Sequence, residues 1–153
     1  MYIRFIVILE NIMKLKKILI YSLISIGLIG TTCLAYADFN DGWTAYSKED
    51  YKTAFKEWRP LAEKGDAKSQ TNLGILYYNG RGTLKDYKKA IAWFKKAAEQ
   101  GEVESQFILG EIYIEGKAIG KSYKNAKYWV QLAYENDFVG AKELWDEHEL
   151  WKY

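Results

Sequence analysis

The chain has 153 residues and a formal net charge of +2, and 49% of its residues are hydrophobic, 27% charged and 16% aromatic. This length leaves room for one domain or a short array of repeats, not for a two-domain catalytic cleft, and the composition is that of a folded protein. One Cys and one His exclude an intrachain disulfide and argue against a zinc site of Cys and His ligands. We expect a packed, mostly helical protein with no metal or cofactor.

Residues 1–37 have the three parts of a secretory signal. Three lysines between residues 14 and 17 form the basic region, an apolar run of 13 residues follows at 18–30, and Ala-Tyr-Ala at 35–37 is a typical cleavage site. A retained membrane helix is the alternative, but 13 residues fall short of the roughly 20 needed to span a bilayer. We therefore expect cleavage that leaves Asp38 at the mature N-terminus.

Two features of this leader leave alternatives open. Met13 is an alternative start, because residues 1–12 add an apolar stretch that a signal peptide does not require. Cys33 suggests a lipid anchor, but the residues before it lack the branched aliphatic and the small last residue of a lipoprotein site. We expect an exported protein, periplasmic or secreted, without a lipid anchor.

The sequence after the leader repeats itself at a spacing of 36 residues. Aligned at this spacing are Tyr51 with Tyr87 and Tyr123, Ala54 with Ala90 and Ala126, Ser69-Gln70 with Ser105-Gln106, Leu73-Gly74 with Leu109-Gly110, and Tyr77 with Tyr113. The spacing of large and small residues within each unit predicts two helices in close contact. Gly74 and Gly110 are expected where a neighbouring backbone approaches.

Glycine and short polar residues mark the expected helix ends. Gly80 and Gly116 should end the first helix of each unit, because glycine tolerates the left-handed conformation found at a helix C-terminus. Asp86 and Ser122 should cap the second helices, because their side-chain oxygens can accept hydrogen bonds from free backbone amides. Asp137 stands where the other second helices are followed by glycine, and it also tolerates a positive φ.

These residues resemble the Sel-one-like repeat (SLR) family, which is related to the tetratricopeptide repeats. The residues that carry the resemblance are Ser69-Gln70, Leu73-Gly74, Tyr77, Gly80-Arg81-Gly82, Asp86, Lys89-Ala90, Trp93-Phe94, Ala97-Ala98 and Gly101, and their counterparts in the next unit. The resemblance implies an all-α fold, a right-handed α-α superhelix with about 36 residues per unit. It divides the chain into a tetratricopeptide-like first unit at 38–66, repeats at 67–102 and 103–138, and a capping helix at 139–153.

The resemblance also implies a non-enzymatic scaffold that binds other proteins. Some cysteine-rich members of the family are linked to penicillin binding, but they carry a disulfide in each unit, whereas no Cys follows Ala37 here. The residues themselves also give little support for catalysis, because the one His, His148, lies among acidic neighbours that point in different directions along a helix. A cell-wall protein that binds or hydrolyses peptidoglycan or β-lactams is the alternative function.

The first helices of such a stack line its concave side, so their residues outside the repeat core form the candidate partner-binding surface. These residues, with two from the terminal helix, are Trp43, Tyr46, Thr71, Ile75, Tyr78, Asn79, Phe107, Glu111, Ile114, Glu115, Glu143 and Glu147. Aromatic and aliphatic residues interleaved with carboxylates suit a protein or peptide with basic and apolar side chains. Packing between neighbouring helices is the alternative role for Trp43, Tyr78 and Ile114.

Charge points to the same kind of partner. Without the leader the chain holds 18 basic and 19 acidic residues, and no basic block is long enough to suggest a nucleic-acid partner. The four glutamates among the candidate residues are expected to lie together on one side. They would give the concave surface a negative field although the chain as a whole is almost neutral.

Overall fold

The computed structural model describes residues 39–153. The expected leader, the alternative start at Met13, Cys33 and the cleavage site before Asp38 lie outside the described residues. A helix over residues 39–47 is followed by α2 (Tyr51–Glu63), α3 (Ala67–Asn79), α4 (Tyr87–Glu99), α5 (Val103–Glu115), α6 (Tyr123–Glu135), α7 (Ala141–Glu147) and the short 3-10 helix η1 (Leu150–Lys152). No strand occurs between residues 39 and 153, so the predicted all-α class is confirmed.

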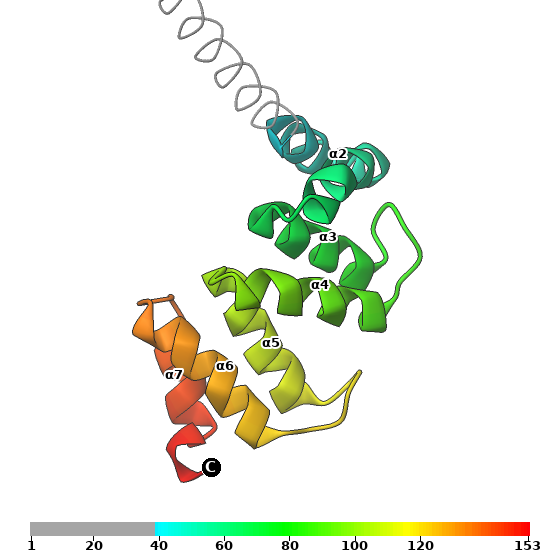
Figure 1. Ribbon diagram of the computed structural model, residues 1–153. Helices are drawn as coiled ribbons and strands as arrows, with labels where there is room; N and C mark the ends of the chain where they lie inside the picture. The colour runs from blue at the N-terminus through cyan, green and yellow to red at the C-terminus, as the bar shows by residue number, and fades with distance from the viewer. Residues whose placement is uncertain (1–38) are drawn as a thin grey trace, which may run out of the picture. The chain divides into compact units, whose positions relative to one another are not determined.

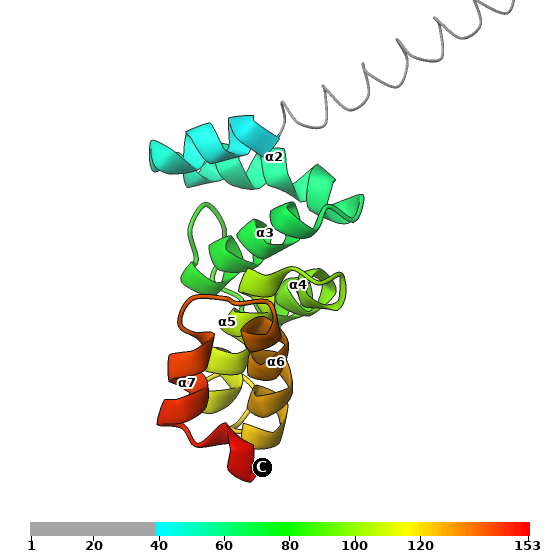
Figure 2. The same ribbon diagram turned by 90° about the vertical axis from the view of Figure 1, so that its left-hand side faces the viewer.

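Each helix packs mainly on its neighbours in the sequence, as Figures 1 and 2 show. The largest interfaces join α3 to α4 and α5 to α6, and smaller ones join α2 to α3 and α4 to α5. The result is a solenoid of helix pairs, with α2 near one end and the C-terminus at the other. We call the helix over 39–47, α3 and α5 the first helices and α2, α4 and α6 the second helices. None of the helices in this described part is long and apolar enough to cross a membrane.

Within each pair, a large side chain of the second helix lies directly against a glycine of the first. The three contacts are Gly42 with Trp58, Gly74 with Phe94, and Gly110 with Val130. A Cβ atom on Gly74 would lie 2.6 Å from the ring of Phe94, a side chain that is 1% exposed. The prediction that a neighbouring backbone approaches is wrong for Gly74, where the Phe94 ring fills the space, whereas at Gly110 the Val130 side chain is nearest and the Val130 backbone nitrogen would lie 3.6 Å from an added Cβ.

The predicted helix ends are confirmed. The Asp86 and Ser122 side chains each accept a hydrogen bond from the backbone amide three residues later, at 3.0 Å and 3.3 Å. Gly80 and Gly116 follow α3 and α5 with φ of 69° and 71°, and Asp137 takes the left-handed conformation with φ of 55°. These local signals set the lengths of the helices, and so they set which side chains share a helix face.

Successive pairs are joined by buried glutamines. Near the start of α3, the side-chain amide of Gln70 donates a hydrogen bond to the carbonyl of Ala62 at 3.0 Å. Near the start of α5, Gln106 makes the same bond to Ala98 at 3.2 Å. Both glutamines are 4% exposed, so these bonds pair polar groups that would be costly to bury alone.

The two glutamines differ in their second hydrogen bond. Gln100, at the end of α4, donates to Oε1 of Gln70 at 2.7 Å. Asn136 occupies the equivalent place after α6, but its shorter side chain donates only to a carbonyl of its own helix. In the described chain Oε1 of Gln106 therefore has no hydrogen-bond partner. The last repeat lacks a polar contact that the preceding repeat has.

We predict that Gly74→Ala lowers the free energy of unfolding by about 1–3 kcal/mol, because the added methyl group would overlap the Phe94 ring. Alanine favours a helix over glycine by about 1 kcal/mol, so the same substitution should be neutral or stabilising in a Phe94→Ala background. Urea unfolding of the two single variants and the double variant measures this coupling. An equal cost in both backgrounds would contradict the contact.

We predict that Asn136→Gln raises the free energy of unfolding by about 1 kcal/mol, because the longer amide can reach the free oxygen of Gln106. The matched control is Gln100→Asn in the preceding repeat, which should lower the stability by a similar amount by freeing the oxygen of Gln70. Urea unfolding is again the measurement. The explanation fails if the two substitutions change stability in the same direction.

Candidate functional site

A groove runs between the first helices α3 and α5. It has a volume of about 280 Å³. Its lining residues are Ile75, Tyr78 and Asn79 from α3, Ile108, Glu111, Ile112 and Glu115 from α5, and Phe94 from α4. We call it the α3–α5 groove. Five of these residues are among the predicted partner-binding residues, so the structure brings together Ile75, Tyr78, Asn79, Glu111 and Glu115.

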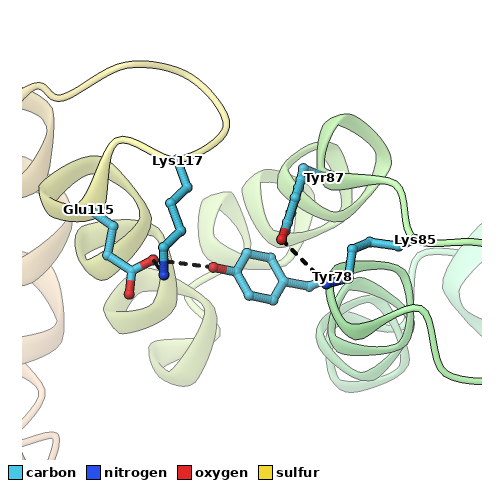
Figure 3. A network of polar contacts seen from close by, with 5 residues as sticks. All are labelled: Tyr78, Lys85, Tyr87, Glu115 and Lys117. Atoms are coloured by element: carbon cyan, nitrogen blue, oxygen red, sulfur yellow. Dashed lines mark hydrogen bonds and ion pairs between the residues drawn. The ribbon is translucent and has the colours of Figure 1, made fainter.

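A polar network crosses one part of this groove (Figure 3). The Tyr78 hydroxyl donates a hydrogen bond to Glu115 at 3.3 Å, and Lys117 forms a salt bridge with the same carboxylate at 3.2 Å. The Tyr78 ring packs edge-on against Tyr87 with centroids 5.0 Å apart, and Lys85 donates to the Tyr87 hydroxyl at 3.4 Å. Burial raises the pKa of Tyr78, and the Glu115 carboxylate raises it further. Tyr78 thus stays a hydrogen-bond donor that ties one repeat to the next.

Glu111 lies one helical turn before Glu115 and differs from it in having no counter-charge. Within residues 39–153 it forms no salt bridge or side-chain hydrogen bond, whereas Glu115 has both. Desolvation raises the pKa of Glu111, and the neighbouring Glu115 carboxylate raises it further. The side chain is exposed to solvent on one side and lies beside the apolar residues Ile75 and Ile108 on the other, so a cation placed in the groove would stabilise its charge.

A second hollow lies nearer the N-terminal end of the first helices. It has a volume of about 400 Å³, and its lining residues are Phe39, Asn40, Trp43, Lys68, Thr71, Asn72, Glu102 and Glu104. Trp43 is 54% exposed, and its ring stacks on Tyr46 with centroids 5.9 Å apart. Desolvation and the neighbouring Glu102 raise the pKa of Glu104. The hollow thus combines an aromatic ring with carboxylates, as the α3–α5 groove does, but it is also lined by a cation, Lys68.

Comparison with known families identifies the repeat that builds these grooves. The model of the Sel1 repeat matches residues 67–102 and 103–138. The chain contains two consecutive Sel1 repeats. The α3–α5 groove thus lies between the first helices of two consecutive Sel1 repeats.

Two solved structures are similar to the chain. One is a protective antigen of uropathogenic Escherichia coli with an SLR fold, at 35% sequence identity and a TM-score of 0.70; the match covers 75% of this chain and 26% of that one. The other is a Sel1 repeat protein from Oxalobacter formigenes, at 28% identity and a TM-score of 0.65, with coverage of 70% and 44%. The chain spans less than half the length of either protein. No curated protein matches it significantly.

Two of the predicted binding residues are buried. Thr71 is 2% exposed, and its hydroxyl shares a hydrogen bond of 2.8 Å with Ser105 in the next repeat. Ile114 is 7% exposed and packs in the C-terminal core with Val130 and Leu150. The prediction that these two residues are accessible is wrong, because both positions are used in packing between helices.

Four further predicted residues do not line either groove, and one of them, Tyr46, is half-buried and packs against Trp58 with ring centroids 5.6 Å apart. Phe107 is half-buried and packs against Phe138, with ring centroids 5.0 Å apart. Glu143 and Glu147 are exposed on α7 and do not line either groove. The structure therefore places two of the four glutamates, Glu111 and Glu115, in the α3–α5 groove.

Several groove residues were not predicted from the sequence. Lys68 and Asn72 lie four residues apart on α3, and Asn72 lies three residues before Ile75, so helical spacing from a predicted residue could have found them. Phe39 and Asn40 lie in the first helix of the stack, where the repeat spacing is shortened. No group of three His, Cys, Asp or Glu side chains in residues 39–153 is arranged to hold a metal ion.

Proposed function

We propose that the protein is an interaction scaffold whose α3–α5 groove binds a segment of a partner protein with a basic residue flanked by apolar ones. Sel1 repeat proteins are generally scaffolds for protein–protein interactions. The observation that carries the proposal is the place of Glu111, whose exposed carboxylate forms no salt bridge in the described structure and lies among apolar groove residues. A Lys or Arg of the partner would supply that charge.

The two kinds of lining residue would act on different properties of the complex. Carboxylates mainly steer a basic segment to the surface and set its orientation. Apolar side chains such as Ile75 and Ile108, with the Tyr78 ring, would lose water on binding and so slow dissociation. This division suits an extended or helical segment that lies along the first helices.

We predict that Glu111→Gln with Glu115→Gln weakens partner binding by about tenfold or more and reduces its salt dependence, because the cation of the partner loses its counter-charges. The partner is first isolated by pull-down from an envelope extract, and its affinity is then measured with the purified components. The matched control is Glu99→Gln with Glu135→Gln, which removes two glutamates from the second helices. Equal effects of the two double variants would contradict the proposal.

The same complex should weaken as the pH falls through the raised pKa of Glu111, because protonation removes the charge that attracts the partner. This loss should begin at a higher pH than for an ordinary Glu, and it should be absent from the Gln double variant. Folding stability should change little in that variant, because the Glu115–Lys117 salt bridge that it removes is exposed and an amide oxygen at position 115 can still accept the Tyr78 hydrogen bond. Affinity measured against pH for both proteins tests the assignment.

We also propose that the protein is exported and begins at Asp38 after cleavage. The support is the sequence order of lysines, apolar run and Ala-Tyr-Ala site in residues 14–37. Intact-mass measurement of protein from the extracytoplasmic fraction should give the mass of the chain without residues 1–37. A retained leader, or a lipid on Cys33, would contradict this proposal while leaving the groove proposal standing.

A further inference from the structure

The first and second helices carry opposite net charge. The second helices α2, α4 and α6 hold nine basic and four acidic residues, whereas the three first helices hold one basic and four acidic residues. The near-neutral chain is therefore divided between an acidic set of helices, which bears the α3–α5 groove, and a basic set. The basic set is not used by the function proposed above.

A third groove lies between the second helices α2 and α4. It has a volume of about 510 Å³, and its lining residues are Arg59, Glu63, Leu73, Tyr77, Lys89, Ala92, Trp93 and Lys96. We call it the α2–α4 groove. Basic side chains line both sides of the groove: Arg59 lies on α2, and Lys89 and Lys96 lie on α4. Its accessible apolar surface comes from the half-buried rings of Tyr77 and Trp93, since Leu73 is buried.

The lysines of this groove lie over aromatic rings. The Lys96 ammonium group is 4.4 Å from the centroid of the Trp93 ring, and that of Lys89 is 5.4 Å from the Tyr77 ring. Such contacts hold a cation in place without neutralising it, so its charge remains available to a carboxylate. Lys96 forms no salt bridge within residues 39–153, whereas Arg59 is paired with Glu63 at 2.8 Å and Lys89 with Asp86 at 3.4 Å. Lys96 is thus the most available cation of the groove.

We propose that the α2–α4 groove binds an acidic segment of a partner protein, with carboxylates placed at Lys89 and Lys96 and an apolar side chain against Trp93. Charge complementarity favours this occupant, because three cations and one carboxylate line a groove whose rings offer apolar contact, and Lys96 has no salt bridge within residues 39–153 while the Lys89 pair with Asp86 is long, at 3.4 Å. A nucleic acid is disfavoured, because its phosphates would be repelled by the Glu63 carboxylate in the groove lining and would need a longer row of cations than the groove provides. A flat bilayer surface would not reach rings that are half-buried between helices.

The experiment uses the full chain and a fluorescein-labelled short peptide of alternating Glu and Leu, with binding followed by fluorescence anisotropy. Lys89→Gln with Lys96→Gln should weaken binding by about tenfold or more. The matched control is Lys88→Gln with Lys95→Gln, which removes two lysines from the same helix one residue earlier, outside the groove lining. This control should bind as the unchanged protein does, and all three proteins should have similar melting temperatures.

A second pair of measurements separates this site from the α3–α5 groove. Glu111→Gln with Glu115→Gln should leave binding of the acidic peptide unchanged, and a peptide of alternating Gln and Leu should bind weakly to every variant. Equal weakening by the two lysine pairs, or no binding of the acidic peptide, would overturn the proposal. Two other outcomes would also overturn it. In both, the Lys89 and Lys96 variant binds the acidic peptide as the unchanged protein does, but it has lost either binding to phosphatidylglycerol vesicles or self-association.

Discussion

The fold depends on the close contact between a glycine of each first helix and a large side chain of the second helix. Trp58, Phe94 and Val130 are nearly inaccessible to solvent, and each lies where a Cβ on the opposing glycine would overlap it. A larger residue at the glycine position would push the two helices apart. Because this contact is made on the inner side of each pair, the remaining faces of both helices are left to form grooves with the next pair.

The contacts between pairs contain more polar groups than those within them. Buried glutamine side chains bond to the last turn of the preceding helix, and a hydroxyl pair, Thr71 with Ser105, joins α3 to α5. Such bonds have strict geometry, so they set how one pair is placed against the next. Within the pairs, a side-chain bond from Gln100 to Gln70 supports the glutamine of α3, but the oxygen of Gln106 in α5 has no such partner, because Asn136 replaces the longer glutamine after α6. In a solenoid, a local loss of this kind affects mainly the neighbouring pair.

The same repeat also separates charge. Helical periodicity places the packing residues on one side of each helix and the charged residues on the solvent side. Because the first helices are acidic and the second helices are basic, the surfaces that the two sets form differ in charge. Glu111 and Glu115 then lie in a groove between first helices, and Lys89 and Lys96 lie in a groove between second helices. A chain with almost balanced charge thus has two surfaces that suit oppositely charged partners.

The sequence by itself determined the helical class and the helix ends at Gly80, Asp86, Gly116 and Ser122, because capping and positive φ depend on a few neighbouring residues. It also determined five residues of the α3–α5 groove, since helical spacing from the Leu-Gly motif identifies a shared face. Only the tertiary structure decided that Thr71 and Ile114 are buried, that Phe94 and Val130 fill the space at the glycines, and that Glu143 and Glu147 lie outside the grooves. These outcomes depend on which side chains of a neighbouring helix contact each position. The periodicity of one helix does not predict those contacts.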